Sequence, residues 1–191
     1  WQLLRSMPAA IDVPDAAPAV AGQLSRLNDV PVEGIQAGEA EQRYFRAQFA
    51  LTWSATVPRA SEVLNGSWWA PDSQERLVSV EEDAADALKL APGDRLEWTI
   101  QGKPVSARIA NIRRTDAARV GANTPFVFSP HTLDGFPVIY YGSLRARPAE
   151  VGAIQRAVFE RYPTVTVVNA ARSEEHTSEL QSRFGISYAV F

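Results

Sequence analysis

The clearest local pattern in this chain is residues 79–110, which read SVEEDAADALKLAPGDRLEWTIQGKPVSARIA. Ser79 and Glu82 have the spacing of a capping box, in which each side chain satisfies a free backbone N–H at a helix start. Apolar residues then recur at helical spacing as far as Leu88, and Pro92-Gly93-Asp94 predicts the end of the helix. We therefore expect one short, capped helix.

A β-hairpin is predicted directly after this helix. Apolar residues occupy every second position in both arms, at Leu96, Trp98 and Ile100 and again at Val105, Ala107 and Ile109. This period of two is typical of strands with one buried face. Gln101-Gly102-Lys103 supplies the turn between the two arms.

The flanking sequence predicts further strands and a second helix. Residues 47–53 alternate like a strand, and 126–128 form a short apolar strand. Residues 138–144, 148–162 and 164–168 predict a strand, a helix and a strand, which together make a C-terminal βαβ unit. Its strands are expected to be parallel or near-parallel with a right-handed crossover. The expected fold class is α+β.

Composition excludes several classes of protein. Of the 191 residues, 46% are hydrophobic and 21% charged, which is typical of a folded globular chain and not of a disordered one. The net charge of -3 argues against nucleic-acid binding. There is no cysteine, so disulfides and thiolate metal sites are excluded. No run of apolar residues is long enough for a membrane helix, and we interpret the start at Trp1 as a cut.

Residues 172–191 resemble a translated sequencing adapter. RSEEHTSELQS, from Arg172 to Ser182, and ISYAVF, from Ile186 to Phe191, both back-translate to adapter DNA, and three residues at the position of a variable index separate them. The alternative is a short polar helix followed by a strand. We expect the native chain to end near Ala171 and the tail to lie outside the fold.

The sequence offers little that could perform catalysis. Without the adapter-like tail, His131 is the only histidine, and one histidine can neither build a metal cluster nor complete a triad without an arranged partner. Its Ser129-Pro130-His131-Thr132 setting favours a solvated turn. Glu81, Glu82 and Asp83 suit the start of a helix better than acid–base chemistry. We predict no catalytic residue, no cofactor and no metal.

Two pairs of adjacent residues are candidates for contact with a partner or substrate: Trp68 with Trp69, and Arg113 with Arg114. Neighbouring residues of an extended segment point to opposite sides, so both tryptophans would not easily enter one core, which leaves one for an exposed contact or both covered by loops. The arginines, with Arg108 and Arg119 near them, suit lipid head groups or an acidic partner; a solvated strand end is the alternative.

Several short sequence segments, taken in order, resemble the extracytoplasmic core domain of FtsX/MacB-type ABC transporter permeases. The nearest likeness is to the YbbP-like permeases. These segments are QLSRLN (23–28), NGSWW (65–69), VSVEE (78–82) leading to LKL (88–90) and PGD (92–94), FVFSP (126–130) and YPTVTV (162–167). None of them is a catalytic signature. Their order, from about residue 17 to 170, carries the resemblance.

The resemblance implies a bacterial inner-membrane permease whose domain faces the periplasm and whose partner is a cytoplasmic ABC ATPase. The ATPase activity would belong to that separate subunit, so this chain would not be an enzyme. It would relay ATP-driven motion to export or extract a hydrophobic or lipid-like substrate. Membrane helices would lie outside this fragment.

The resemblance also implies a division of the chain. Residues 1–64 and 121–171 would form a porter-like α/β lobe, truncated at its start, with 65–120 as a β-rich insertion that holds the capped helix. Two other classes stay open at this point. One is a free periplasmic binding or chaperone-like module, and the other is a lipid-related hydrolase, against which the missing histidine partner argues.

Overall fold

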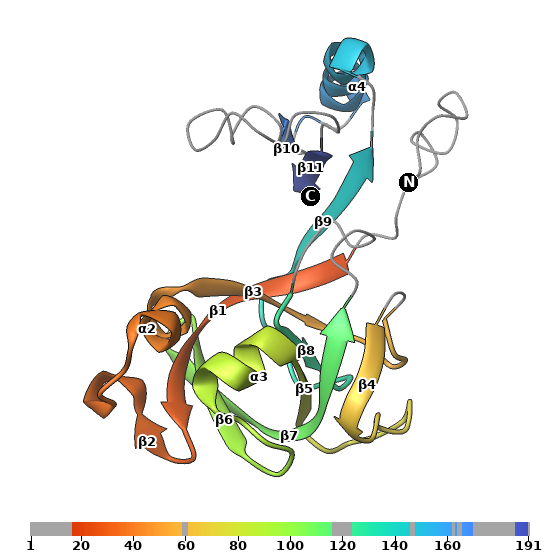
Figure 1. Cartoon of the computed structure of the whole chain (residues 1–191). Helices are drawn as coiled ribbons and strands as arrows, with labels where there is room; N and C mark the ends of the chain where they lie inside the picture. The colour runs from red at the N-terminus through yellow and green to blue at the C-terminus, as the bar shows by residue number, and fades with distance from the viewer. Residues whose placement is uncertain are drawn as a thin grey trace. The chain divides into compact units, whose positions relative to one another are not determined.

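The computed structural model describes residues 17–58, 61–115, 124–145, 148–161, 163, 166–169 and 186–190. The chain divides into two compact units, one of residues 19–138 and one of residues 1–18 with 139–191. Strands and helices are mixed in the chain (Figure 1). The fold is therefore α+β, as the sequence indicates.

Six strands close into a barrel in the unit of residues 19–138 (Figure 1). Around the ring they are β1 (Ala17–Leu27), β3 (Gln48–Trp53), β8 (Phe126–Phe128), β5 (Leu77–Glu81), β7 (Lys103–Thr115) and β6 (Arg95–Ile100), and β6 pairs again with β1. The β3–β8 and β5–β7 pairs are parallel, and the other four are antiparallel. Closure gives each of these strands two neighbours and removes free edges from the ring.

The ring crosses the divisions expected from the sequence. Residues 1–64 contribute β1 and β3, residues 65–120 contribute β5, β6 and β7, and β8 comes from the last segment. The structure groups all of them within residues 19–138. Ring closure accounts for this grouping, because β5, β7 and β6 alone would leave one free edge at β5 and another at β6, which β8 and β1 cover, while β3 joins β8 to β1.

The barrel interior is filled by large apolar side chains. Trp98 is fully buried, and its ring lies edge-on to Phe126 and Phe128, with centroids 5.3 and 4.7 Å away. Leu51, Val78 and Ile109 are completely enclosed around them. Both arms of the predicted hairpin thus send their alternating apolar residues into one core.

A β-bulge in β7 changes which residues face this core. The pairing of β5 with β7 shifts by one residue after Val78 and Ile109, so Ser79 lies opposite Asn111. Strict alternation would have sent Asn111 and Arg113 inward after Ile109. The extra residue reverses the faces, so Ile112 joins the core instead. The strand also continues to Thr115, beyond the hairpin arm expected from the sequence.

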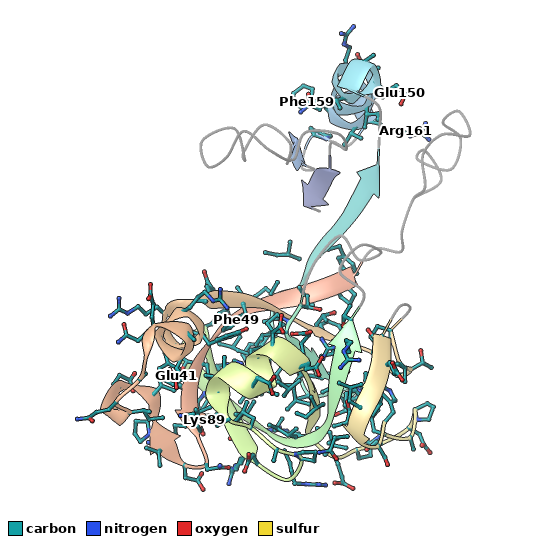
Figure 2. The ribbon with its side chains drawn as sticks, in the orientation of Figure 1. Glu41, Phe49, Lys89, Glu150, Phe159 and Arg161 are labelled. Atoms are coloured by element: carbon teal, nitrogen blue, oxygen red, sulfur yellow. The ribbon has the colours of Figure 1, made fainter. Side chains whose placement is uncertain are left out.

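Helices α2 (Glu39–Arg46) and α3 (Glu82–Leu88) pack on the barrel and contact each other. Figure 2 shows Glu41 of α2 and Lys89, directly after α3, extending toward one another, and their charged atoms are 3.7 Å apart. A 3-10 helix, Val32–Gly34, follows the short strand β2 (Val30–Pro31), which pairs with β1.

The predicted cap of α3 needs a correction. Its N-cap is Glu81, whose Oε2 accepts a hydrogen bond from the backbone N–H of Asp83 at 2.9 Å. Ser79 is instead a buried residue of β5. The strand continues two residues further than the local pattern suggested, because its backbone pairs with both β7 and β8.

Gly93 and Asp94 fasten the turn after α3 to β7. The Gly93 N–H donates to the Ile109 carbonyl, and the Ile109 N–H donates to the Asp94 carbonyl, both at 2.8 Å. The Asp94 carboxylate also accepts from the N–H of Ala91 at 2.8 Å. Gly93 has φ +101°, a conformation that side chains disfavour. The helix itself ends earlier than the sequence suggested, at Leu88, where Lys89 takes a left-handed backbone conformation with φ 55°. Pro92-Gly93-Asp94 therefore sets the start of β6 and does not end α3.

The second unit contains a strand, a helix and a strand in chain order: β9 (Ile139–Arg145), α4 (Pro148–Arg161) and β10 (Thr166–Asn169). A further strand, β11 (Ile186–Val190), lies between β9 and β10 and is antiparallel to both. It follows that β9 and β10 run in the same direction. β11 belongs to the adapter-like segment, of which 172–185 and 191 lie outside the described residues. The adapter origin of residues 172–191 stays a prediction.

Candidate functional site

The two candidate arginines lie in different environments at the end of β7. Arg113 is 2% exposed, whereas Arg114 is exposed. The Arg113 guanidinium donates to the carbonyl oxygen of Ser79 at 2.7 Å, to the Ser79 hydroxyl at 3.3 Å and to the carbonyl of Thr124. The burial of Arg113 does not fit an exposed contact with a partner, and it does not fit the alternative of a solvated strand end either. Arg113 ties β7 to β5 and to Thr124, two residues before β8.

Electrostatics agree with a structural role for Arg113. Burial lowers the pKa of its guanidinium to about 10, with the Glu81 carboxylate opposing this shift, so the group stays charged at neutral pH. Burial also raises the pKa of Glu81, which lies opposite Arg113 in the β5–β7 register. Each partner therefore supplies the charge that makes burial of the other tolerable.

Arg114 forms a two-pronged ion pair with Glu82 on the surface. Its Nε and Nη2 donate to the two carboxylate oxygens at 2.7 and 2.8 Å. The hydrogen bonds from Arg114 hold the pKa of Glu82 below its ordinary value. The sequence suggested Glu82 as half of a capping box. In the structure its carboxylate pairs with Arg114 of β7 instead.

A chain of buried polar groups leads from Arg113 to the aromatic pair. The Ser79 hydroxyl donates to Asn111 Oδ1 at 2.5 Å, and Asn111 Nδ2 donates to the carbonyl of Ser67 at 3.1 Å. Ser79 and Asn111 have no solvent exposure. Just before Ser67, strand β4 (Ser61–Gly66) pairs with β7 outside the ring and ends at Gly66. This polar chain fixes the segment that carries Trp68 and Trp69.

The two tryptophans stack on each other and do not point apart. Their ring centroids are 4.1 Å apart with a tilt of 32°. Residues 67–70 are not part of a strand, so the alternation assumed for an extended segment does not apply. Each indole N–H donates to a carbonyl after β3, from Trp68 to Ala55 at 3.2 Å and from Trp69 to Ser54 at 2.9 Å.

The pair differs in burial. Trp69 packs with Leu77 and Val127 and is 7% exposed, whereas Trp68 is half-buried. Of the four candidate contact residues, Trp68 and Arg114 are therefore the two that reach solvent. Trp69 and Arg113 hold the surrounding structure in place.

His131 lies on the surface in a turn. It has a positive φ of 65°, and its Nδ1 is 2.9 Å from Asp134 Oδ2. The nearby Ser129 hydroxyl is buried and bonds to the Glu75 carbonyl at 2.7 Å and to Thr132 at 2.9 Å. The histidine and the serine thus have separate partners, which gives no support to a Ser–His pair.

Sequence reasoning missed the roles of Ser79 and Asn111. A signal for Asn111 was present: extending the alternation of Val105, Ala107 and Ile109 would have sent an amide and then a guanidinium into an apolar core. That conflict indicates a register shift near residue 110. No comparable local signal marks Ser79, because its partners come from β7.

Within the described residues, no cluster of acidic, histidine or cysteine side chains is arranged to hold a metal ion. Among the described helices, none has the length and apolar character needed to span a membrane. The described site is thus a closed barrel with a buried polar network and a half-exposed aromatic pair.

The barrel-bearing chain is similar to part of a transport protein. It is 30% identical over 128 residues to the "Uncharacterized ABC transporter permease YbbP" of Escherichia coli (strain K12). The match covers 67% of this chain and 15% of that relative, so the chain spans a small part of the relative's length. No protein-family model and no solved structure matches the chain. The similarity indicates relationship to an ABC transporter permease.

Proposed function

We propose that this chain is part of the periplasmic region of an FtsX/MacB-type permease in a bacterial inner membrane. The observation that carries the proposal is the 30% identity to an ABC transporter permease over 128 residues. In the intact protein, membrane helices outside this chain would anchor the domain, and a cytoplasmic ABC ATPase subunit would supply the energy. The domain would catalyse no reaction itself.

The mechanical role that we propose is to relay ATP-driven motion to a hydrophobic or lipid-like substrate. A closed barrel supports this role because its paired strands and dense core transmit displacement without deforming. The stacked Trp68 and Trp69, fastened to β7 through Asn111 and to the chain after β3 through their N–H groups, give a rigid aromatic contact. Trp68 and the Arg114–Glu82 pair are the proposed contact residues.

The location can be tested with cysteine labelling because this chain contains no cysteine. Lys103 is exposed at the start of β7, whereas Ile109 is completely buried. In the intact gene product, freed of any other cysteines, Lys103→Cys should react with a membrane-impermeant maleimide in cells whose inner membrane is intact. Ile109→Cys, the control, should react only after denaturation. Labelling of Lys103→Cys only after inner-membrane disruption would contradict a periplasmic position.

The DNA that flanks this region tests the permease class and the adapter origin together. We expect apolar segments of about 20 residues on both sides of the domain. We also expect native sequence to replace residues 172–191. A gene that encodes a freestanding secreted protein would favour the periplasmic binding or chaperone-like module instead.

The relay role needs a functional readout. In membranes that contain the permease and its ATPase, Trp68→Ala should reduce substrate export while basal ATP hydrolysis continues. Tyr140→Ala is the matched control, since it removes another partly exposed aromatic ring at a different position. Equal loss of export in both variants would remove the special role of Trp68.

A further inference from the structure

A basic hollow lies on the barrel surface, apart from the tryptophan pair. It has a volume of about 330 Å³ and is lined by Arg76, Gly93, Arg95, Ser106, Ala107 and Arg108. The three arginines come from the residue before β5, from β6 and from β7. Sequence reasoning grouped Arg108 with Arg113 and Arg114, but the structure groups it with Arg76 and Arg95.

Backbone pairing forces the three arginines together. Arg95 lies directly opposite Arg108 in the antiparallel β6–β7 pair. The Arg108 N–H donates to the Arg76 carbonyl at 3.0 Å. Like charges placed directly opposite on adjacent strands are destabilising. The strand pairing by itself therefore disfavours guanidinium groups at these positions, whereas an anionic ligand would favour them.

The acidic groups near the hollow do not neutralise it. Glu75 binds Arg108 at 2.7 Å, and Asp29 lies 3.8 Å from Arg95. Both carboxylates are mostly solvent-exposed, and exposed ion pairs are weak and screened by salt. Among the described residues, Arg76 has no acidic partner. An incoming anion would meet three guanidinium groups, two of them paired with the exposed carboxylates of Glu75 and Asp29, and a third carboxylate, that of Glu97, on Ser106.

The other polar groups of the hollow have their own partners. The Ser106 hydroxyl donates to Glu97 Oε2 at 3.1 Å, and the Gly93 N–H is used by Ile109. Recognition would thus fall to the arginine side chains. Guanidinium groups bind oxyanions through paired N–H donors. A phosphate has enough oxygen atoms to accept from more than one guanidinium group at once, whereas a carboxylate pairs with one.

We propose that the Arg76–Arg95–Arg108 hollow is a binding site for a phosphate group, carried by a lipid head group or by free phosphate. The site stands on the hollow alone and does not depend on the proposed transport role. When the phosphate arrives, it competes with Glu75 for Arg108 and gives Arg76 its counterion.

The test compares two triple variants of the full chain. Arg76→Gln, Arg95→Gln and Arg108→Gln together remove the hollow's charge. Arg43→Gln, Arg46→Gln and Lys103→Gln together make the same change of charge at residues that do not line the hollow. Binding of inorganic phosphate is measured by calorimetry. Binding to vesicles of phosphatidylglycerol with phosphatidylcholine, or of phosphatidylcholine alone, is measured by flotation.

We expect the unaltered chain to bind phosphate or the anionic vesicles. The hollow variant should lose about tenfold or more of that affinity, since losing even one charge-assisted hydrogen bond weakens binding by about that factor. The control variant should retain its affinity within about twofold because its changes touch only exposed, screened charges. Binding to vesicles alone identifies a lipid head group, and binding to phosphate alone identifies a free anion.

Two results would overturn the proposal. One is no binding of either probe by the unaltered chain, and the other is an equal loss in both triple variants, which would indicate a general charge effect. If the hollow variant does not fold, Arg76→Gln replaces it, because that side chain has no ion pair to lose among the described residues. Unchanged affinity in Arg76→Gln would then refute the site. Neither result bears on whether the chain belongs to a permease.

Discussion

The barrel and helix α4 bury their apolar side chains to different extents. Every ring strand has two neighbours, and the core holds fully enclosed side chains such as Leu51 and Trp98. Helix α4 buries Val151, Ile154 and Val158 on one face, but its Phe159 is 67% exposed (Figure 2). This difference in burial indicates that the barrel has a hydrophobic core of its own. Its cooperative unfolding should not depend on packing around α4.

The largest effect should come from a cavity in the barrel. Leu51→Ala is expected to cost about 3 kcal/mol, since removal of a fully buried side chain loses both transfer energy and packing. The matched change in the other unit, Ile154→Ala, should leave the barrel transition in place. Urea unfolding of the full chain, followed by tryptophan fluorescence, measures both. Equal loss of barrel stability in the two variants would show that the barrel core is not independent of α4.

Arg113 and Arg114 allow a buried and an exposed side chain to be compared within the single strand β7. Arg113→Met should lower the free energy of unfolding by about 3 kcal/mol, because it strands the buried Glu81 charge and two carbonyls. Arg114→Met should cost much less than Arg113→Met, because its pair with Glu82 is exposed and screened by solvent. Thermal and urea unfolding test the order. A larger cost at Arg114 would refute the assignment of Arg113 as the internal clamp.

Two glycines with positive φ, Gly66 and Gly102, differ in how much space surrounds them. A Cβ at Gly66 (φ +86°) would lie 2.2 Å from the Ala110 carbonyl oxygen, whereas one at Gly102 (φ +77°) meets nothing within 4 Å. We expect Gly66→Ala to cost about 2 kcal/mol or more and Gly102→Ala about 1 kcal/mol, because both pay for the left-handed backbone but only the first also clashes. Near-UV circular dichroism should also report a disturbed Trp68–Trp69 pair in Gly66→Ala alone.

The smallest effect concerns pH. Arg114 lowers the pKa of Glu82 below the ordinary 4.5, so the folded state binds that proton less readily than the unfolded state. The stability contributed by Glu82 is therefore present above pH 4.5 and is lost as pH falls through the lowered pKa. Glu82→Gln should melt slightly below the unaltered chain at neutral pH and match it in acid. A difference that persists well below pH 4.5, or that is unaffected by salt, would contradict this origin.

Local patterns predicted much of the barrel but little of the site. The alternation at Leu96–Ile100 and Val105–Ile109 marked two strands correctly, and the helix before them was placed within a few residues. The site depended on contacts between distant segments. The stacked Trp68 and Trp69 are held by carbonyls after β3, and the bulge in β7 sends Arg113 to Ser79 and Thr124.

By itself, the sequence determined the two strands of the hairpin and the approximate position of the helix before them, because side-chain periodicity and turn residues act over a few neighbouring positions. The tertiary structure decided that six of these strands close into a ring, through the parallel β3–β8 and β5–β7 pairs. It also decided that Arg113 is buried while Arg114 is exposed, and that Arg108 joins Arg76 and Arg95. Such outcomes depend on pairing between segments far apart in the chain, where local periodicity carries no information about the partner or the register.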